Sequence, residues 1–299
     1  MRLIQPIFAS YSTRETSLGE DNKIYNAWKE VNERVKKDID LGVKEFLLFY
    51  IPEFKLGEKS SSHRGDEDID AHKFDQVCVT AASLSKDIQG NGCRLIVDVC
   101  LCSYTQDGHC CIIGDQEKTD KLLTMSARDI YTASGATVAP SDCQDNTVKN
   151  IRATKGGGID IMSYSTKFRS TFYRDWRNAM KIPKGIHRPY QLDVHDREGA
   201  INRSIKYSND GANELMVKPG MTSLDLIKPI KEATGKPCGA YQTSGEWLGI
   251  GAPGSLEETY HIFKRAGADY MITYGARRLT RHHSCLLYTS DAADERSSV

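Results

Sequence analysis

The sequence has no excess of charge of either sign. Lysine and arginine together number 40, and so do aspartate and glutamate, which gives the 299-residue chain a formal net charge of zero at pH 7. A protein without net charge has no overall field that would draw it to nucleic acid or to an anionic membrane surface. We therefore expect neither of these as a partner.

Long apolar runs are absent too. A membrane-spanning helix needs about 20 consecutive apolar residues, and the runs here are far shorter. The first residues, MRLIQPIFASYS, hold one arginine and a short apolar run, without the longer apolar stretch and the cleavage pattern of a secretory signal. We therefore predict a cytoplasmic protein, in which thiols stay reduced.

The sequence also does not support a disulfide framework. The nine cysteines are odd in number, and four of them lie in the stretch DVCLCSYTQDGHCC, residues 98–111. A disulfide framework predicts an even number of cysteines in a secreted chain. This cluster of cysteines therefore needs another explanation.

Eight short apolar segments recur along the chain and predict strands. Most are continuous runs, which is typical of parallel strands buried on both faces. They cover residues 3–9, 45–51, 94–100, 136–141, 160–165, 214–219, 238–244 and 270–275. Helical segments separate them, so we predict an α/β fold of the (β/α)8 TIM-barrel type in preference to a doubly wound sheet, which the same alternation permits.

Two of the intervening segments carry patterns of helix ends. Residues 223–235 end in a glycine, a common helix stop, and Pro229 fits best near a helix start. Ser255 and Glu258 have the spacing of a capping box, which predicts a helix that begins there and closes at Gly267.

The end of the chain differs from the rest. After Leu279 the sequence has little amphipathic period, and the last residues resemble translated read-through rather than a covering helix. We predict a single catalytic barrel domain over residues 1–283 and a non-native or disordered tail over residues 284–299.

The clustered cysteines follow the third predicted strand, at the barrel end where catalytic residues lie. Cys100 and Cys102 are two residues apart, so in an extended strand their side chains point the same way, and Cys110 can return on a loop. Three protein ligands with one open position are the pattern of a catalytic zinc site. Packing of small thiols is the alternative, but the clustering beside His109 favours a metal, with His109 near the site rather than a ligand. Cys111 is an alternative thiol, and packing is expected of Cys78, Cys93, Cys143 and Cys238.

Two lysines stand at the ends of neighbouring predicted strands. Lys218 follows the apolar run ELMV, and Lys167 ends the stretch MSYSTK. Burial and a second ammonium group would lower the pKa of Lys218 and supply the free amine that a Schiff base requires. The alternative, two rim lysines paired with carboxylates, is less suited to a pair beside a metal site.

With these residues in view, the sequence resembles the porphobilinogen synthase (5-aminolevulinate dehydratase) family, in its zinc-dependent branch. The resemblance covers about residues 3–275 in the family's order. The matching stretches are DVCLCSYTQDGHC, VAPSD, MSYSTKFRSTFY, YQL, LMVKPGM, YQTSGEW and AGADYMITY. It implies a barrel enzyme that condenses two molecules of 5-aminolevulinate to porphobilinogen and releases two waters.

The resemblance also implies roles for single residues. Lys218 would form the Schiff base with the first substrate, and Lys167 would be its partner for the second. A zinc ion, with magnesium as a second possible metal, is the implied cofactor. The remaining implied residues are the zinc ligands Cys100, Cys102 and Cys110, the polar neighbours Asp98 and Asp142, and the carboxylate contacts Ser244 and Tyr274 for one substrate and Arg177 and Gln191 for the other.

Several positions depart from the family pattern. Asp107 stands where the family has the first of two histidines that precede the third cysteine. The segment after Asp142 reads CQDNTV, and His187 and Arg188 stand where the family tends to have two basic residues. The family forms homo-oligomers through an arm that precedes the first strand, and the first strand here begins at residue 3. We therefore expect a homo-oligomer smaller than the family's octamer.

Two alternative functions remain open at this point. A class I aldolase-like barrel would use one Schiff-base lysine, although three clustered thiols and a second lysine are unexpected there. A catalytically weakened metal-binding paralogue would account for these departures from the family pattern. Turnover of 5-aminolevulinate distinguishes all three.

Overall fold

The computed structural model describes residues 1–11, 18, 22–27, 30–57, 74–154, 158–179, 182, 185–252 and 254–281. The predicted tail over residues 284–299, with Cys285, lies outside them. In the described part, no helix is long and apolar enough to cross a membrane.

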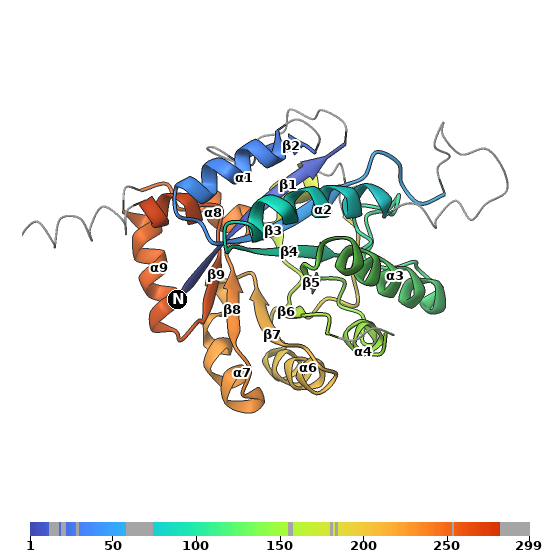
Figure 1. Ribbon diagram of the computed structural model, residues 1–299. Coiled ribbons are helices and arrows are strands. Elements are labelled where there is room, and N and C mark those ends of the chain that lie inside the picture. Colours follow the sequence, from blue (N-terminus) through green and yellow to red (C-terminus); the bar gives the residue numbers. More distant parts are fainter. Residues whose placement is uncertain are drawn as a thin grey trace, which may run out of the picture.

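Eight parallel strands form a barrel with helices around it, so the predicted fold is confirmed (Figure 1). The strands pair in the order β5-β4-β3-β1-β9-β8-β7-β6, and a parallel bridge between Val138 and Ile161 brings β5 against β6. Each predicted apolar run supplies one of these strands. Their bounds are β1 (Arg2–Ser10), β3 (Glu45–Ile51), β4 (Arg94–Val99), β5 (Thr137–Pro140), β6 (Met162–Lys167), β7 (Glu214–Lys218), β8 (Cys238–Tyr241) and β9 (Tyr270–Ile272), and the short β2 (Ile24–Asn26) pairs with β1.

Helices cover the outside of the barrel because their apolar stripes face the strands. The longer ones are α1 (Val31–Asp40), α2 (Asp75–Gln89), α3 (Gln116–Ser134), α6 (Arg197–Asn209) and α9 (Ser255–Arg265). The shorter ones are α4 (Thr147–Arg152), α5 (Arg174–Ala179), α7 (Ile227–Thr234), α8 (Ser244–Gly249) and the 3-10 turns η1 (Thr171–Tyr173) and η2 (Met221–Leu226).

The predicted helix ends are partly correct. The segment over residues 223–235 contains α7, with Pro229 in its first turn and Gly235 at φ 65° after its end. The capping box at Ser255 is wrong, because Gly254 occupies the cap position and the Ser255 hydroxyl donates a hydrogen bond to the Ala252 carbonyl, 2.6 Å away. The helix begins where predicted, but its first turn is not capped by that side chain.

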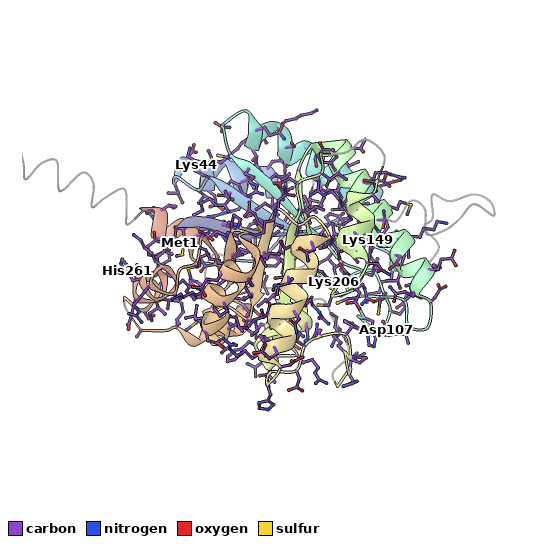
Figure 2. The ribbon with its side chains drawn as sticks, turned by 90° about the horizontal axis from the view of Figure 1, so that it is seen from below. Met1, Lys44, Asp107, Lys149, Lys206 and His261 are labelled. Atoms are coloured by element: carbon purple, nitrogen blue, oxygen red, sulfur yellow. The ribbon has the colours of Figure 1, made fainter. Side chains whose placement is uncertain are left out.

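The two ends of the barrel carry different groups. Met1 and Lys44, which precede β1 and β3, lie on the opposite side of the molecule from Asp107, which follows β4 (Figure 2). At the amino ends of the strands, two arginines and three carboxylates form one network of ion pairs. Its members are Arg2, Glu45, Arg94, Asp160 and Glu214, with contacts of 2.7 Å from Arg94 to both Asp160 and Glu214.

Candidate active site

Both predicted lysines lie at the carboxyl end of the barrel. Lys167 ends β6 and Lys218 ends β7, and the two residues are register partners in the parallel pair. Their side chains are 7% and 8% exposed. Strand pairing therefore sets two buried amines side by side, as the sequence predicted.

Aromatic rings enclose the Lys218 amine. Its Nζ lies 4.0 Å from the ring centroid of Tyr241, and the rings of Tyr164, Tyr173 and Phe49 lie 5.1–5.7 Å away. Burial is the first reason that the pKa of Lys218 falls to about 7, and the charge of Lys167 is the second. An amine enclosed by these rings is available in its neutral form near neutral pH.

Lys167 has a different environment from Lys218. Its Nζ donates a hydrogen bond to the Ser141 carbonyl and lies 4.0 Å from the sulfur of Cys110. Burial is the largest single effect and favours the neutral amine, but the negative charge of Cys110, together with smaller contributions from Cys143, Cys100 and Cys102, raises the pKa of Lys167 well above its ordinary value. The surroundings therefore favour the neutral amine at Lys218 and the protonated amine at Lys167.

The three predicted cysteines converge at one point. The sulfur atoms of Cys100, Cys102 and Cys110 all lie within 4.8 Å of one another. Zinc binds thiolate sulfur at about 2.3 Å, so three sulfurs this close can share one tetrahedral ion. Hydrogen bonds from Cys100 and then Cys102 lower the pKa of Cys110, which favours the thiolate that a metal requires. The cluster fits zinc.

His109 and Cys111 are not members of this cluster. The His109 ring nitrogen Nδ1 lies 3.2 Å from the Tyr190 hydroxyl, which also accepts a hydrogen bond from the backbone N–H of Cys110. His109 thus lies beside the loop that carries the third cysteine, as expected for a residue near the site.

The two predicted aspartates have different surroundings. Asp98 lines the cavity beside both lysines, and its Oδ1 is buried without a hydrogen-bond partner among the described residues. Burial raises its pKa to about 6, and the charges of Lys167 and Lys218 limit the rise. The Asp142 carboxylate instead accepts hydrogen bonds from the Gln144 N–H at 2.8 Å and the Thr147 hydroxyl at 2.7 Å.

Two small compartments meet at Lys218. The larger contains Asp98, two of the cysteines, Lys167, Arg177, Arg188 and Gln191, and the smaller contains Thr243, Ser244 and Tyr274. Phe49, Tyr173, Trp176 and Lys218 line both. Their volumes are about 40 and 10 Å³, so side chains at the mouth must move before an organic substrate can enter.

The larger compartment is suited to an anion. Arg177 and Arg188 both line it, and among the described residues neither is paired with a carboxylate. The Arg177 guanidinium donates to the Ser170 carbonyl at 3.2 Å, and Arg188 donates to the Gly108 carbonyl at 3.0 Å. Burial first, and then the charge of Arg188, lowers the pKa of Arg177. Gln191 adds a buried Oε1 without a partner in the described chain.

The smaller compartment places Ser244 and Tyr274 together. Ser244 is 2% exposed, and its hydroxyl lies 3.4 Å from the Trp176 N–H, which donates to it. The Tyr274 ring stacks on Phe8 at 5.5 Å and on Trp247 at 6.3 Å. The two pairs of predicted carboxylate contacts are thus on different sides of Lys218.

Two features of the site were not predicted from the sequence. Tyr164 alternates into the barrel interior, where its buried hydroxyl has no partner among the residues that the structure describes. Glu246 is a buried carboxylate that accepts hydrogen bonds from the N–H groups of Gly220, Met221 and Thr243 and from the Thr243 hydroxyl. It joins the loop after β7 to the loop after β8. The spacing of Thr243 and Glu246 is that of a capping box, which could have predicted the bonds to Thr243, whereas those to Gly220 and Met221 depend on the fold.

Comparison with known proteins assigns this arrangement to a family. The family model "Delta-aminolevulinic acid dehydratase" matches residues 1–282. Proteins of that name from Archaeoglobus fulgidus and Helicobacter pylori are each 34% identical to the chain, over 93% and 81% of it and over 89% and 77% of their own lengths. The solved structure of the enzyme of that name from Toxoplasma gondii, in complex with the reaction product porphobilinogen, aligns with a TM-score of 0.81 at 26% identity, over 93% of this chain and 84% of that one. Dihydropteroate synthase from Stenotrophomonas maltophilia, at 12% identity and a TM-score of 0.53, shares only the fold.

Proposed function

Because this chain belongs to the delta-aminolevulinic acid dehydratase family and has its activity, porphobilinogen synthesis, we propose that Lys218 is the residue that first binds substrate covalently. The observation that carries this assignment is the enclosed amine of Lys218, with a pKa of about 7, between two compartments. The two compartments match a reaction that joins two molecules of 5-aminolevulinate.

The neutral Lys218 amine attacks the ketone carbon of one substrate molecule. The carbinolamine takes up a proton, loses one water and becomes a protonated imine, which withdraws electrons from the adjacent carbon. That carbon can then lose a proton and form the bond to the second molecule. Asp98, buried beside both lysines with a pKa of about 6, is placed to exchange such a proton.

Lys167 is proposed to hold the second substrate molecule. Its amine is kept protonated by the negative charge of the cysteines around it, of which Cys110 contributes most and would also bind a metal. A metal held by these cysteines would share that negative charge and so favour the neutral amine of Lys167. The two lysines would then act in sequence rather than together.

The carboxylate groups of the two substrates are proposed to bind in the two compartments. Ser244 and Tyr274 would donate hydrogen bonds to one of them, and Arg177 and Gln191 would bind the other. Arg188 is added to the second pair because it is buried and lines the same compartment. Arginine binds carboxylates through two parallel hydrogen bonds, which fixes orientation as well as position. Asp142 is proposed to support the site indirectly, because its carboxylate accepts a hydrogen bond from Thr147 at the start of α4.

Cys100, Cys102 and Cys110 would hold a zinc ion with one position left for substrate or water. Such an ion would polarise a substrate oxygen or lower the pKa of bound water. The expected homo-oligomer, a magnesium site and the cytoplasmic location stay predictions.

A colour assay for porphobilinogen on the purified protein tests this function. Zinc-loaded protein should convert 5-aminolevulinate, chelation should abolish conversion, and added zinc should restore it. Borohydride added with 5-aminolevulinate should fix an adduct on Lys218. An adduct without any porphobilinogen would favour the aldolase-like alternative, and neither adduct nor product would favour the weakened metal-binding paralogue.

A further inference from the structure

A larger hollow, separate from the two compartments, lies between the segments that follow the two lysines. Its volume is about 340 Å³, which is within the range of small-molecule sites. The residues that line it follow the two lysines directly in sequence. They are Phe168, Arg169, Ser170, Thr171, Phe172, Pro219, Thr222, Ser223, Asp225 and Leu226, together with Val194 and Arg197.

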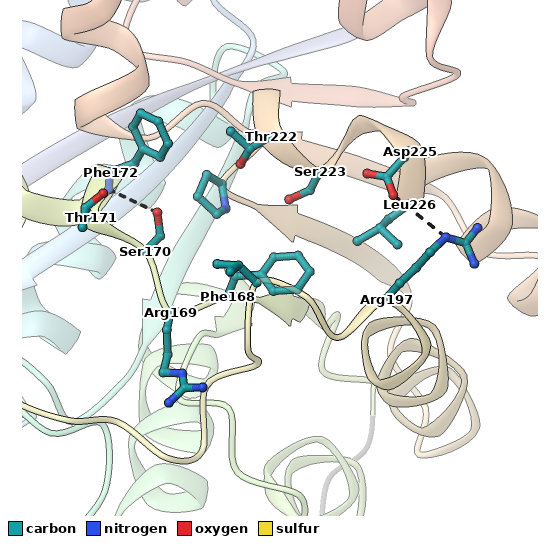
Figure 3. Close-up of a pocket in the computed structure, with 12 residues that line it drawn as sticks. Phe168, Arg169, Ser170, Thr171, Phe172, Arg197, Thr222, Ser223, Asp225 and Leu226 are labelled. Carbon is teal, nitrogen blue, oxygen red and sulfur yellow. Dashed lines mark hydrogen bonds and ion pairs between the residues drawn. The ribbon is translucent and has the colours of Figure 1, made fainter.

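The lining combines an apolar base with positive charge at its sides. Figure 3 shows Arg169 and Arg197 on either side of Phe168, with Leu226 beside it. Phe172 is 39% exposed and Val194 is 61% exposed, so apolar surface is open to solvent at this hollow. A side chain or ligand that covers it would remove that surface from water.

The charges of the lining favour an anion. The residues that line the hollow include two guanidinium groups and one carboxylate. Arg169 is bonded to Asp193, and Arg197 donates a hydrogen bond of 3.2 Å to the exposed Glu198 and forms a longer ion pair of 4.0 Å with Asp225. The Arg197 side chain is 52% exposed, so its guanidinium can turn toward a ligand.

Ser223 adds a polar group without a function in the fold. Its backbone interrupts η2 with φ −131° and ψ 22°, and its buried hydroxyl has no hydrogen-bond partner within the described ranges. Figure 3 shows its oxygen, with that of Thr222, on the side of the hollow that faces Phe168. A buried hydroxyl left unbonded costs free energy that a ligand oxygen could offset.

We propose that this hollow is a second ligand site, for a small organic carboxylate with an apolar body. The apolar part would cover the exposed side chains of Phe172 and Val194, and the carboxylate would pair with Arg197. The proposal does not depend on the reaction chemistry at Lys218, because it concerns a different set of side chains.

The probe is 3-phenylpropanoate, titrated calorimetrically into the whole protein. It should bind with a dissociation constant on the order of 1 mM, as expected for a small ligand on one ion pair and one apolar surface. The neutral 3-phenylpropan-1-ol and the ringless propanoate should each bind at least about tenfold more weakly. Equal binding of the neutral analogue would overturn the proposal.

Substitutions locate the bound probe. Arg197→Glu should weaken binding at least about tenfold, whereas Arg174→Glu, at an arginine 78% exposed and outside the hollow, should leave it unchanged. Binding that is lost in Arg177→Gln and kept in Arg197→Glu would place the probe in the active site and reject the proposal. Absence of binding, together with a smaller assembly of Arg197→Glu in light scattering, would assign the hollow to contact with a second copy of the chain and reject it as well.

Discussion

The two ends of the barrel differ in how their polar groups are paired. At the amino ends of the strands, Arg94 reaches three carboxylates at 2.7–3.4 Å, and Arg2 reaches two of the same three. At the carboxyl ends, Asp98 and Gln191 keep buried oxygens without partners among the described residues. Unpaired buried groups cost stability, so the unpaired oxygens of Asp98 and Gln191 in the compartment beside Lys218 mark it as a place that receives ligands.

The largest expected effect is at the end with unpaired groups. Lys218→Arg keeps a positive charge but cannot form an imine, so porphobilinogen synthesis should fall by a factor on the order of 10⁴ or more. The measurement is the initial rate, with bound zinc determined in parallel. Bound zinc should be unchanged, and Lys206→Arg on α6 is the control. A variant that keeps even a tenth of the activity would show that Lys218 is not the covalent residue.

Removal of one sulfur should give the next largest effect. Cys102→Ala leaves two of the three ligands, so both bound zinc and activity should be lost at stoichiometric metal. The measurement is metal content by mass spectrometry after gel filtration. Cys78→Ala, at a half-buried cysteine outside the cluster, should keep both. Full activity in metal-free Cys102→Ala would disprove the metal assignment.

The pKa of Lys218 should appear as a smaller, graded effect of pH. Because burial and Lys167 lower it from 10.5 to about 7, the neutral amine is the main form above pH 7 and falls about tenfold per pH unit below it. The rate of borohydride trapping at low substrate should therefore rise with pH and level off above about pH 8.

The Asp98 carboxylate opposes this lowering, so Asp98→Asn should move the midpoint of the trapping profile below that of the unchanged protein. A midpoint near 10 in the unchanged protein would mean that the amine is not buried in solution.

The end with paired groups should show the smallest effect on turnover. Arg94→Met leaves the carboxylates around it without their shared partner and should lower the free energy of unfolding by roughly 2 kcal/mol, less than for a fully buried pair because the arginine is 25% exposed. Urea unfolding at fixed protein concentration measures this. Arg128→Met, at an exposed pair, should change little. A large fall in kcat of Arg94→Met at unchanged stability would show that the amino end of the barrel also takes part in catalysis.

The positions of the strands along the chain, and the reactive residues at their carboxyl ends, could be predicted from the sequence because both depend on local patterns. Continuous apolar runs gave all eight barrel strands, and the strand ends brought Lys167, Lys218 and the three cysteines to one place. The capping box at Ser255 was wrong because a glycine one residue earlier could take the cap position, and spacing alone does not distinguish the two.

Contacts between distant segments could not be predicted in this way. The pairing of Arg94 with Glu214 joins residues 120 positions apart and depends on the barrel's closure. The same holds for Arg188, which the sequence placed only in a basic segment and which the fold buries against the Gly108 carbonyl. Asp142 and Asp98 looked alike in sequence and differ in the fold, because the Asp142 carboxylate accepts hydrogen bonds from the Gln144 N–H and from the Thr147 hydroxyl at the start of α4.

The Glu246 carboxylate makes the effects of substitutions in two loops depend on each other. Three of the four hydrogen bonds that it accepts come from backbone N–H groups, on the loop after Lys218 and on the loop that leads to Ser244. A mutation that shifts either loop therefore moves the acceptor on which the other depends. Changes in these loops should be strongly epistatic, so an engineer who wishes to alter substrate preference here will have to vary residues 219–221 and 243–246 together.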